Sequence, residues 1–375
     1  MENYSEGYCA INVMDPPCLQ PSAVTTVLLP ITYFLLFIVS VLGNSLSLWI
    51  FSKGIQLKTA THAYLINLVI SNLLLCSAMP FIGLYHKEGN QWKHDSALCI
   101  TVASIVTPIM HSTMNASIII LCWLAISRYA ILKRQKTVMK DLSNFLYDKI
   151  FLTVVIKKFC QRKFANYLCI GIWLTVLGPT IPILVYYAFV ESKLTSNITE
   201  VCYNKKLELG GQTSRISSLV VSIVFFLCLF LVLLYYELIR RQVYKSQKKT
   251  SIGERHYIYK KVQRNIAVIQ AVLVTCFFPY HLFKMVFILL TKEQLNDYQL
   301  NILIETKNVL LCLAALRSGT DPIIYMTLDK TFRRQVYIYF RKQSPRSNSS
   351  TIKNTAEINS DVSHQQINKA IAITN

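Results

Sequence analysis

Two oppositely charged residues stand close together within an otherwise apolar stretch, Ile302–Met326. Arg317 and Asp321 are four residues apart, a spacing that places both side chains on one face of a helix. A cation and an anion in this register can neutralise each other in an apolar environment, where either charge alone is expensive to bury. The pair is interpreted either as a purely structural ion pair or as one that rearranges during function.

A second set of candidate residues is basic. Its members stand near the ends of apolar stretches or in the segments that join them: His281, Lys284, Lys307, Lys205 and Lys206. One lysine in such a place can simply extend its ammonium group along the helix to water. Several basic groups on neighbouring elements instead favour an anionic ligand that carries a phosphate or a carboxylate.

The elements that position these side chains must be apolar. Apolar residues make up 53% of the 375 residues and charged residues only 15%, which leaves too little polar surface for a soluble protein. A helix needs about 20 mostly apolar residues to cross the hydrocarbon layer of a bilayer. Seven stretches meet this requirement: Val24–Phe51, Thr61–Tyr85, Cys99–Ser127, Ala165–Val190, Ile216–Tyr236, Ile266–Leu290 and Ile302–Met326. The sequence therefore predicts an all-α membrane protein with a bundle of seven transmembrane helices.

The basic residues fall mainly on one side of the predicted membrane. The chain has 39 Lys and Arg residues against 19 Asp and Glu, and Met1–Gln20 contains no Lys or Arg. Most of the basic residues lie in alternate loops and after Met326, so the positive-inside rule places the N-terminus outside the cell and the C-terminus in the cytoplasm. Anionic membrane lipid and acidic cytosolic proteins are the expected partners of this basic face, and a nucleic-acid polymer is not expected.

The chain divides into four parts. Residues 1–23 form an extracellular tail, 24–326 the seven-helix domain, 327–342 a short helix on the membrane surface, and 343–375 a disordered cytoplasmic tail. The third part alternates apolar and basic residues at helical spacing, which is typical of an interfacial helix. The polar last part is rich in Ser and Thr, and phosphates on it could recruit arrestin.

Outward-facing segments carry two further kinds of candidate site. Asn3 and Asn197 each begin an N-x-[ST] triplet, so both are candidate glycosylation sites. Cys99 and Cys202 face the oxidising side of the membrane, where they can form a disulfide bridge.

An ordered set of short motifs runs through the apolar stretches. In chain order these are Gly43-Asn44, Asn67 to Leu73, Ser127-Arg128-Tyr129, Trp173, Cys276 to His281, and Asp321-Pro322-Ile323-Ile324-Tyr325. The set resembles the rhodopsin-like (class A) G-protein-coupled receptors over residues 28–340. The segment Pro279–Lys284, together with Lys307, resembles the purinergic-type branch of that family.

The sequence contains no Gly-rich phosphate loop, metal-ligand cluster or nucleophile elbow, so no enzymatic activity, cofactor or metal is expected. The resemblance implies a plasma-membrane receptor. Such a receptor transmits binding of an extracellular ligand, here of the nucleotide or lysophospholipid type, to a heterotrimeric G protein. The residues that the resemblance assigns to G-protein coupling and activation are Arg128, Tyr129, Tyr236, Pro279, Asp321, Pro322 and Tyr325. Pro279 and Pro322 also supply helix bends, because proline removes a backbone hydrogen bond. Asn44, Asn72 and Arg317 are the polar residues expected inside the membrane.

Two positions depart from the family pattern. Ser127 stands where an Asp usually pairs with the following arginine, so we expect a weaker restraint on Arg128 and raised basal signalling. Asn72 stands where most relatives carry an Asp that helps to bind sodium, which makes a sodium site doubtful. These departures keep open a nonsignalling scaffold or decoy with the receptor fold. A membrane transporter is a weaker alternative, because the two halves show no repeat.

Overall fold

The structure is a computed structural model that describes residues 22–54, 59–89, 105–140, 158–194, 212–248, 253–290, 296–328 and 330–343. These residues contain helices and no strand. The helices that follow one another along the chain are α1 (Leu29–Trp49), α2 (Ala60–Lys87), α4 (Thr107–Lys140), α6 (Arg162–Leu194), α8 (Gln212–Lys248), α9 (Gly253–Leu290), α10 (Asp297–Leu328) and α11 (Lys330–Gln343). Two π-helical turns, η1 (Val24–Leu28) and η2 (Ile50–Gly54), flank α1.

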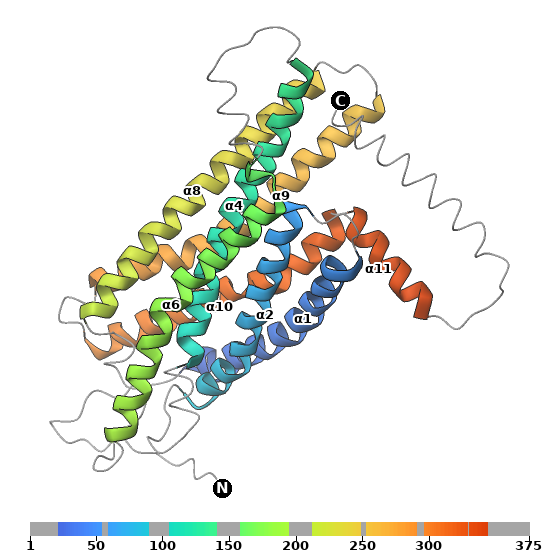
Figure 1. The fold of residues 1–375 in the computed structure, drawn as a ribbon. Helices are drawn as coiled ribbons and strands as arrows, with labels where there is room; N and C mark the ends of the chain where they lie inside the picture. The colour runs from blue at the N-terminus through green and yellow to red at the C-terminus, as the bar shows by residue number, and fades with distance from the viewer. Residues whose placement is uncertain are drawn as a thin grey trace.

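Six of the seven long helices form a closed ring. Going around it, α1 packs against α2, α2 against α4, α4 against α8, α8 against α9, α9 against α10, and α10 against α1. Helix α6 packs against α2 and α4 (Figure 1). Because α4 contacts both α2 and α8, it links the helices that precede it in the chain to those that follow it.

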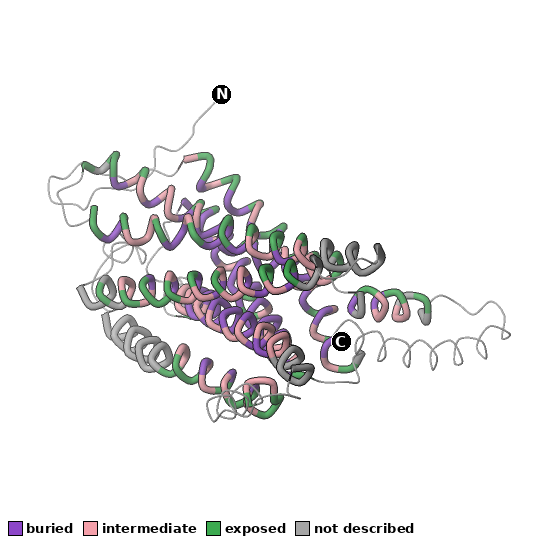
Figure 2. Tube along the Cα trace, turned by 90° about the horizontal axis from the view of Figure 1, so that it is seen from above, coloured by how far each residue is buried: buried purple, intermediate pink, exposed green. Residues whose placement is uncertain are grey.

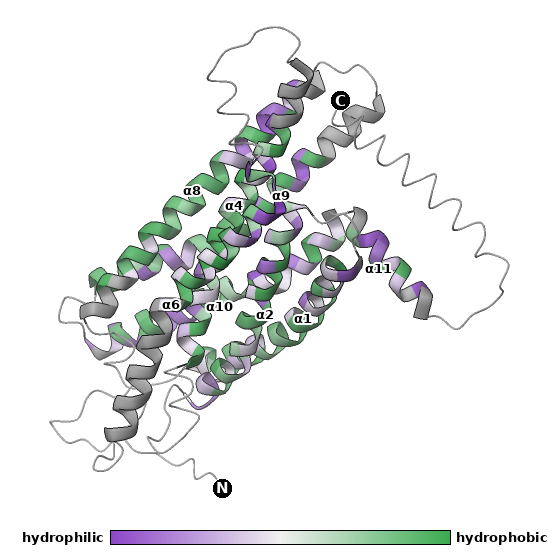
Figure 3. Cartoon of the chain, in the orientation of Figure 1, coloured by the Kyte–Doolittle hydropathy of each residue, from purple (hydrophilic) through white to green (hydrophobic). Residues whose placement is uncertain are grey.

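The helices are apolar enough to span a membrane. By length and composition, six of those described meet the requirement for a membrane-crossing helix, and the seventh predicted stretch, Ala165–Val190, lies within α6. Hydrophobic residues cover most of the length of α1, α2 and α8, and hydrophilic residues gather on α11 (Figure 3). An α-helix satisfies its own backbone hydrogen bonds, which is why it can cross lipid. The predicted fold class is confirmed.

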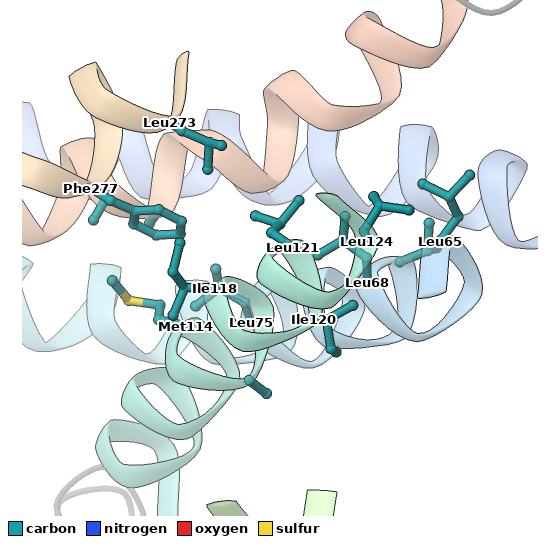
Figure 4. Packing of buried hydrophobic residues seen from close by; sticks show 14 of the residues in the cluster. Leu65, Leu68, Leu75, Met114, Ile118, Ile120, Leu121, Leu124, Leu273 and Phe277 are labelled. Atoms are coloured by element: carbon teal, nitrogen blue, oxygen red, sulfur yellow. The ribbon is translucent and has the colours of Figure 1, made fainter. Parts of the chain in front are cut away.

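Burial is concentrated on the faces that meet inside the bundle (Figure 2). Large side chains from α2, α4 and α9 fill the middle, and those labelled in the close view are Leu65, Leu68, Leu75, Met114, Ile118, Ile120, Leu121, Leu124, Leu273 and Phe277 (Figure 4). Many apolar residues on the outer faces stay exposed, as expected for helices that meet lipid. Trp173 of α6 contributes a polar link, because its indole N–H donates a hydrogen bond of 3.1 Å to the Asn67 side chain of α2.

Helix α11 is attached to the bundle by aromatic contacts. Phe332 lies 5.4 Å from Phe51 of η2 and 5.9 Å from Tyr325 of α10, measured between ring centroids. Beyond the bundle, α11 projects to one side (Figure 1). Phe332 and Val336 are buried while Tyr337 is exposed, so α11 has one apolar face and one polar face. The helix predicted over residues 327–342 begins at Lys330 and ends at Gln343 in the structure.

Several predicted features lie outside the described residues. These are the glycosylation sites at Asn3 and Asn197, the Cys99–Cys202 bridge, Lys205, Lys206, and the tail from 344 onward. They stay predictions. Two of the long helices extend past the predicted spans at their C-terminal ends: α4 continues to Lys140 and α8 to Lys248.

Candidate functional site

A buried polar network is centred on the carboxylate of Asp321 in α10. Arg317, one turn earlier, donates a hydrogen bond of 2.6 Å from Nη2 to Oδ2 of Asp321, and the two residues are 3% and 7% exposed. The side-chain amide of Asn72 in α2 donates to the same oxygen at 2.9 Å. The ion pair predicted from the four-residue spacing is present, and Asn72 adds a neutral donor to it.

Helix α1 joins the network through Asn44. Its Oδ1 accepts a hydrogen bond of 3.1 Å from Asn72, and its Nδ2 donates to the backbone carbonyls of Ser40 and Ser318, both at 2.8 Å. The hydroxyls of Ser40 and Ser318 lie 3.1 Å apart. Buried polar groups are stabilising only when they are hydrogen-bonded, so these bonds tie α1, α2 and α10 together in the middle of the bundle.

The arginine of this network also faces helix α9. Its Cζ lies 5.2 Å from the centroid of the Phe277 ring, and this ring is almost fully buried. A guanidinium over an aromatic face is attracted by the negative charge of the ring face. Arg317 therefore contacts a carboxylate on its own helix and a ring on the neighbouring helix.

A second polar contact joins the C-terminal parts of α4 and α8. Arg128 of α4 donates a hydrogen bond of 3.2 Å to the hydroxyl of Tyr236 in α8. The neighbouring hydroxyl of Ser127 is buried and has no hydrogen-bond partner among the described residues. The rings of Tyr129 and Tyr235 pack at a tilt, with their centroids 5.6 Å apart. In the described part of the chain, Arg128 is thus held by a phenol and has no carboxylate partner.

Tyr325 of α10 contacts two neighbouring elements. It follows Asp321 by one turn on α10, and its hydroxyl is buried without a hydrogen-bond partner among the described residues. Its ring packs edge-on against Phe51 at 5.3 Å. Through its contacts with Phe51 and Phe332, Tyr325 joins α10 to η2 and to α11.

The part of the bundle where α9 ends and α10 begins holds the basic set. His281 of α9 is 3% exposed and stacks face to face on Phe225 of α8, with the ring centroids 3.6 Å apart. Lys284 is half-buried one turn later, and the ammonium group of Lys307 lies 5.3 Å from the centroid of the Phe287 ring. The structure thus brings His281, Lys284 and Lys307 to one region of α9 and α10.

Several residues that form polar or aromatic contacts in the structure were not predicted from the sequence. His111 of α4 lies next to α9, because its Nδ1 is 3.3 Å from the hydroxyl of Tyr280, the residue before His281. Glu305 of α10 accepts hydrogen bonds from the hydroxyls of Ser22 and Thr25. The three aromatic partners Phe225, Phe277 and Phe287 were also missed, because a phenylalanine in an apolar stretch carries no signal that separates a ring facing a charge from ordinary core.

The described residues contain no group of three or more His, Cys, Asp or Glu side chains that could hold a metal ion.

Comparison with known proteins identifies the class. A profile of the family described as "7 transmembrane receptor (rhodopsin family)" matches residues 43–143 and 147–325. The chain therefore belongs to the rhodopsin family of seven-transmembrane receptors, and it is a multi-pass membrane protein. The family resemblance carried by the ordered motifs is confirmed.

Individual relatives narrow the position within this family. The chain is 45% identical to "Probable G-protein coupled receptor 82" of Homo sapiens over 328 aligned residues. The aligned segment covers 87% of this chain and 96% of that protein. The protein of the same name from Mus musculus is 44% identical over 321 residues, or 85% and 96% of the two chains. A purinoceptor of Gallus gallus is 27% identical over 340 residues, or 88% and 84%. The predicted similarity to the purinergic-type branch is therefore confirmed.

Proposed function

We propose that this protein is a plasma-membrane receptor that transmits binding of an anionic extracellular ligand to a heterotrimeric G protein. The observation that carries the proposal is the separation of two basic sites along one bundle. One site, with Lys284 and Lys307, lies in the half assigned to the outside, and the other, Arg128 with Tyr236, lies in the half assigned to the cytoplasm. Helices α9 and α10 run through both halves.

The outer site is suited to a phosphate or a carboxylate. Lys284 stands on α9, and the ammonium group of Lys307 on the adjacent helix α10 lies 5.3 Å from the ring centroid of Phe287, one turn after Lys284. Ammonium groups that share one region of the bundle repel, and an anion bound there would relieve this repulsion while gaining charge-assisted hydrogen bonds. The predicted loop residues Lys205 and Lys206 would add positive charge. Nucleotides and lysophospholipids are the proposed ligand classes, and one relative is named as a purinoceptor.

The proposed orientation rests on the distribution of Lys and Arg. Exposed Arg240, Arg241 and Arg264 lie at the ends of α8 and α9 that would enter the cytoplasm, and Arg333 of α11 is also exposed. A basic inner face is favoured next to anionic lipid and next to acidic protein partners. Arrestin is a further proposed partner, through phosphates on the tail.

The ligand half of the proposal is tested by a screen on living cells. Nucleotides and lysophospholipids are applied to cells that express the parent or the Lys284→Ala variant at equal surface density. We expect one compound to activate the parent, with its half-maximal concentration raised about tenfold or more in the variant, since a charge-assisted hydrogen bond contributes about 1.5–3 kcal/mol. Arg264→Ala, a basic-to-neutral change at the opposite end of α9, is the matched control. Equal responses of parent and Lys284→Ala to every active compound would contradict the outer site.

The proposed coupling to a G protein is tested by substitution of Arg128. Guanine-nucleotide exchange on purified G proteins is measured with membranes that contain the parent or Arg128→Ala. Exchange that depends on the parent and is lost in the variant supports the receptor.

A nonsignalling scaffold or decoy is the second candidate. It is favoured by one observation, the Ser127 hydroxyl that lies buried and without a partner, among the residues described, at the position before Arg128. Equal exchange for the parent, Arg128→Ala and membranes without receptor would support this candidate.

A further inference from the structure

Helices α4 and α8 pack side by side and run in the same direction along their interface. The rings of Tyr129 in α4 and Tyr235 in α8 are in contact. Further along both helices, the backbone carbonyl of Leu132 accepts a hydrogen bond of 3.4 Å from the side chain of Gln242. Later residues of one helix therefore meet later residues of the other.

The same register brings two cysteines together. Cys122 stands seven residues before Tyr129, and Cys228 stands seven residues before Tyr235. Seven residues are close to two turns of an α-helix, so each cysteine lies on the same face of its helix as the tyrosine that follows it. The thiols of Cys122 and Cys228 are hydrogen-bonded to each other, and neither cysteine is in a disulfide.

The two thiols differ in how easily a small molecule can reach them. Cys122 is 4% exposed and belongs to the core of the bundle. Cys228 is only partly buried, and it stands between the exposed Leu227 and the buried Leu229, at the edge of the interface. A small neutral molecule that arrives through the lipid therefore meets Cys228 first and has Cys122 behind it.

We propose that Cys122 and Cys228 form a peroxide-sensitive thiol pair that closes into a disulfide between α4 and α8. An exposed reactive cysteine with a second cysteine poised beside it is the arrangement found in proteins that respond to peroxide. The hydrogen bond from one thiol stabilises the thiolate of the other, and the thiolate is the nucleophile in this chemistry.

The reaction has two steps. The sulfur of Cys228 attacks hydrogen peroxide, so that an S–O bond forms, the O–O bond breaks, and the departing hydroxide leaves as water with the thiol proton. The sulfur of Cys122 then attacks the sulfenic acid, so that the S–S bond forms, the S–O bond breaks, and a second water leaves with the remaining thiol proton. The two thiols lose two electrons in total, and the peroxide gains them.

The disulfide would fix α4 against α8 on the two helices that carry Arg128 and Tyr236. These two side chains are hydrogen-bonded, so the bridge limits how far their helices can separate. The proposed modification is independent of the proposed receptor function, because it needs neither a ligand nor a G protein.

The test treats the purified full chain in lipid nanodiscs with hydrogen peroxide. The dose is raised until the partly exposed Cys160 is oxidised, which shows that peroxide has reacted with the protein. Unreacted thiols are then alkylated, the chain is digested without reductant, and the peptides are identified by mass spectrometry. We expect a peptide pair that joins Cys122 to Cys228 and that a reductant separates. Oxidised Cys160 without this peptide pair would overturn the proposal.

Matched variants test whether the bridge is specific. Cys228→Ala should lose the cross-linked peptide pair, and its Cys122 should stay open to alkylation after unfolding. Cys276→Ala of α9 is the control, because Cys276 is as deeply buried as Cys122, both being 4% exposed, and this variant should form the bridge at the parent yield. The same yield of bridge in a chain unfolded before peroxide is added would count against a pair prearranged by the fold.

Discussion

Gly43 of α1 lies against Pro322 of α10 so closely that a Cβ atom on residue 43 would stand 2.8 Å from both Cβ and Cγ of the proline. A proline ring cannot rotate away from such a contact. The two helix backbones therefore approach each other where the Asn44 side chain reaches Ser318. The close contact and the hydrogen bond depend on the same spacing between α1 and α10.

The first prediction concerns this spacing. Gly43→Ala should destabilise the protein by about 1–3 kcal/mol, because the added methyl group overpacks the interface and pushes α1 from α10. The measurement is the thermal unfolding midpoint of the purified protein. Gly171→Ala of α6 is the matched control, since a Cβ there meets nothing within 4 Å, and alanine stabilises a helix relative to glycine by about 0.5–1 kcal/mol. A midpoint for Gly43→Ala at or above that of the parent would rule out the close approach.

The second prediction concerns the buried ion pair. Arg317→Ala should reduce surface expression sharply, because Asp321 keeps a buried charge without its cation, a loss of about 3–5 kcal/mol. The double variant Arg317→Met with Asp321→Asn should restore expression, since it leaves no unpaired charge. Surface labelling of intact cells measures both. If Arg317→Ala reaches the surface at the parent level and loses only signalling, the structural interpretation of the pair is wrong.

The sequence predicted the parts of this network that depend on local spacing. Arg317 and Asp321 are one helical turn apart, so their contact follows from the geometry of a single helix. The partners on other helices, Asn72 and Phe277, could not be assigned in this way. Their contacts depend on the rotation of α2 and α9 about their own axes, which is set by packing across the whole bundle. His111 was missed for the same reason.

The third prediction concerns the residue before Arg128. Ser127→Asp should lower basal nucleotide exchange about tenfold, because a carboxylate beside Arg128 can draw its guanidinium away from the Tyr236 hydroxyl. Ser127→Asn, which has nearly the same shape without the charge, should stay close to the parent. Exchange is measured without ligand at matched receptor density. Basal exchange in the parent that is no higher than in Ser127→Asp would show that other contacts hold the resting state.

The last prediction concerns the attachment of α11. Phe332 is 1% exposed and packs between Phe51 and Tyr325, so Phe332→Ala should remove about 3–5 kcal/mol of packing and detach the helix from the bundle. Amide hydrogen exchange over 330–343 should then become much faster, while the middle of α10 keeps its protection. Tyr337→Ala alters an aromatic residue on the exposed face of the same helix and should leave this exchange nearly unchanged. Equal acceleration in the two variants would mean that α11 is held by the membrane surface and gains little from its contact with Tyr325. Acceleration in Phe332→Ala alone would establish that the contacts of Phe332 with Phe51 and Tyr325 hold α11 against the bundle.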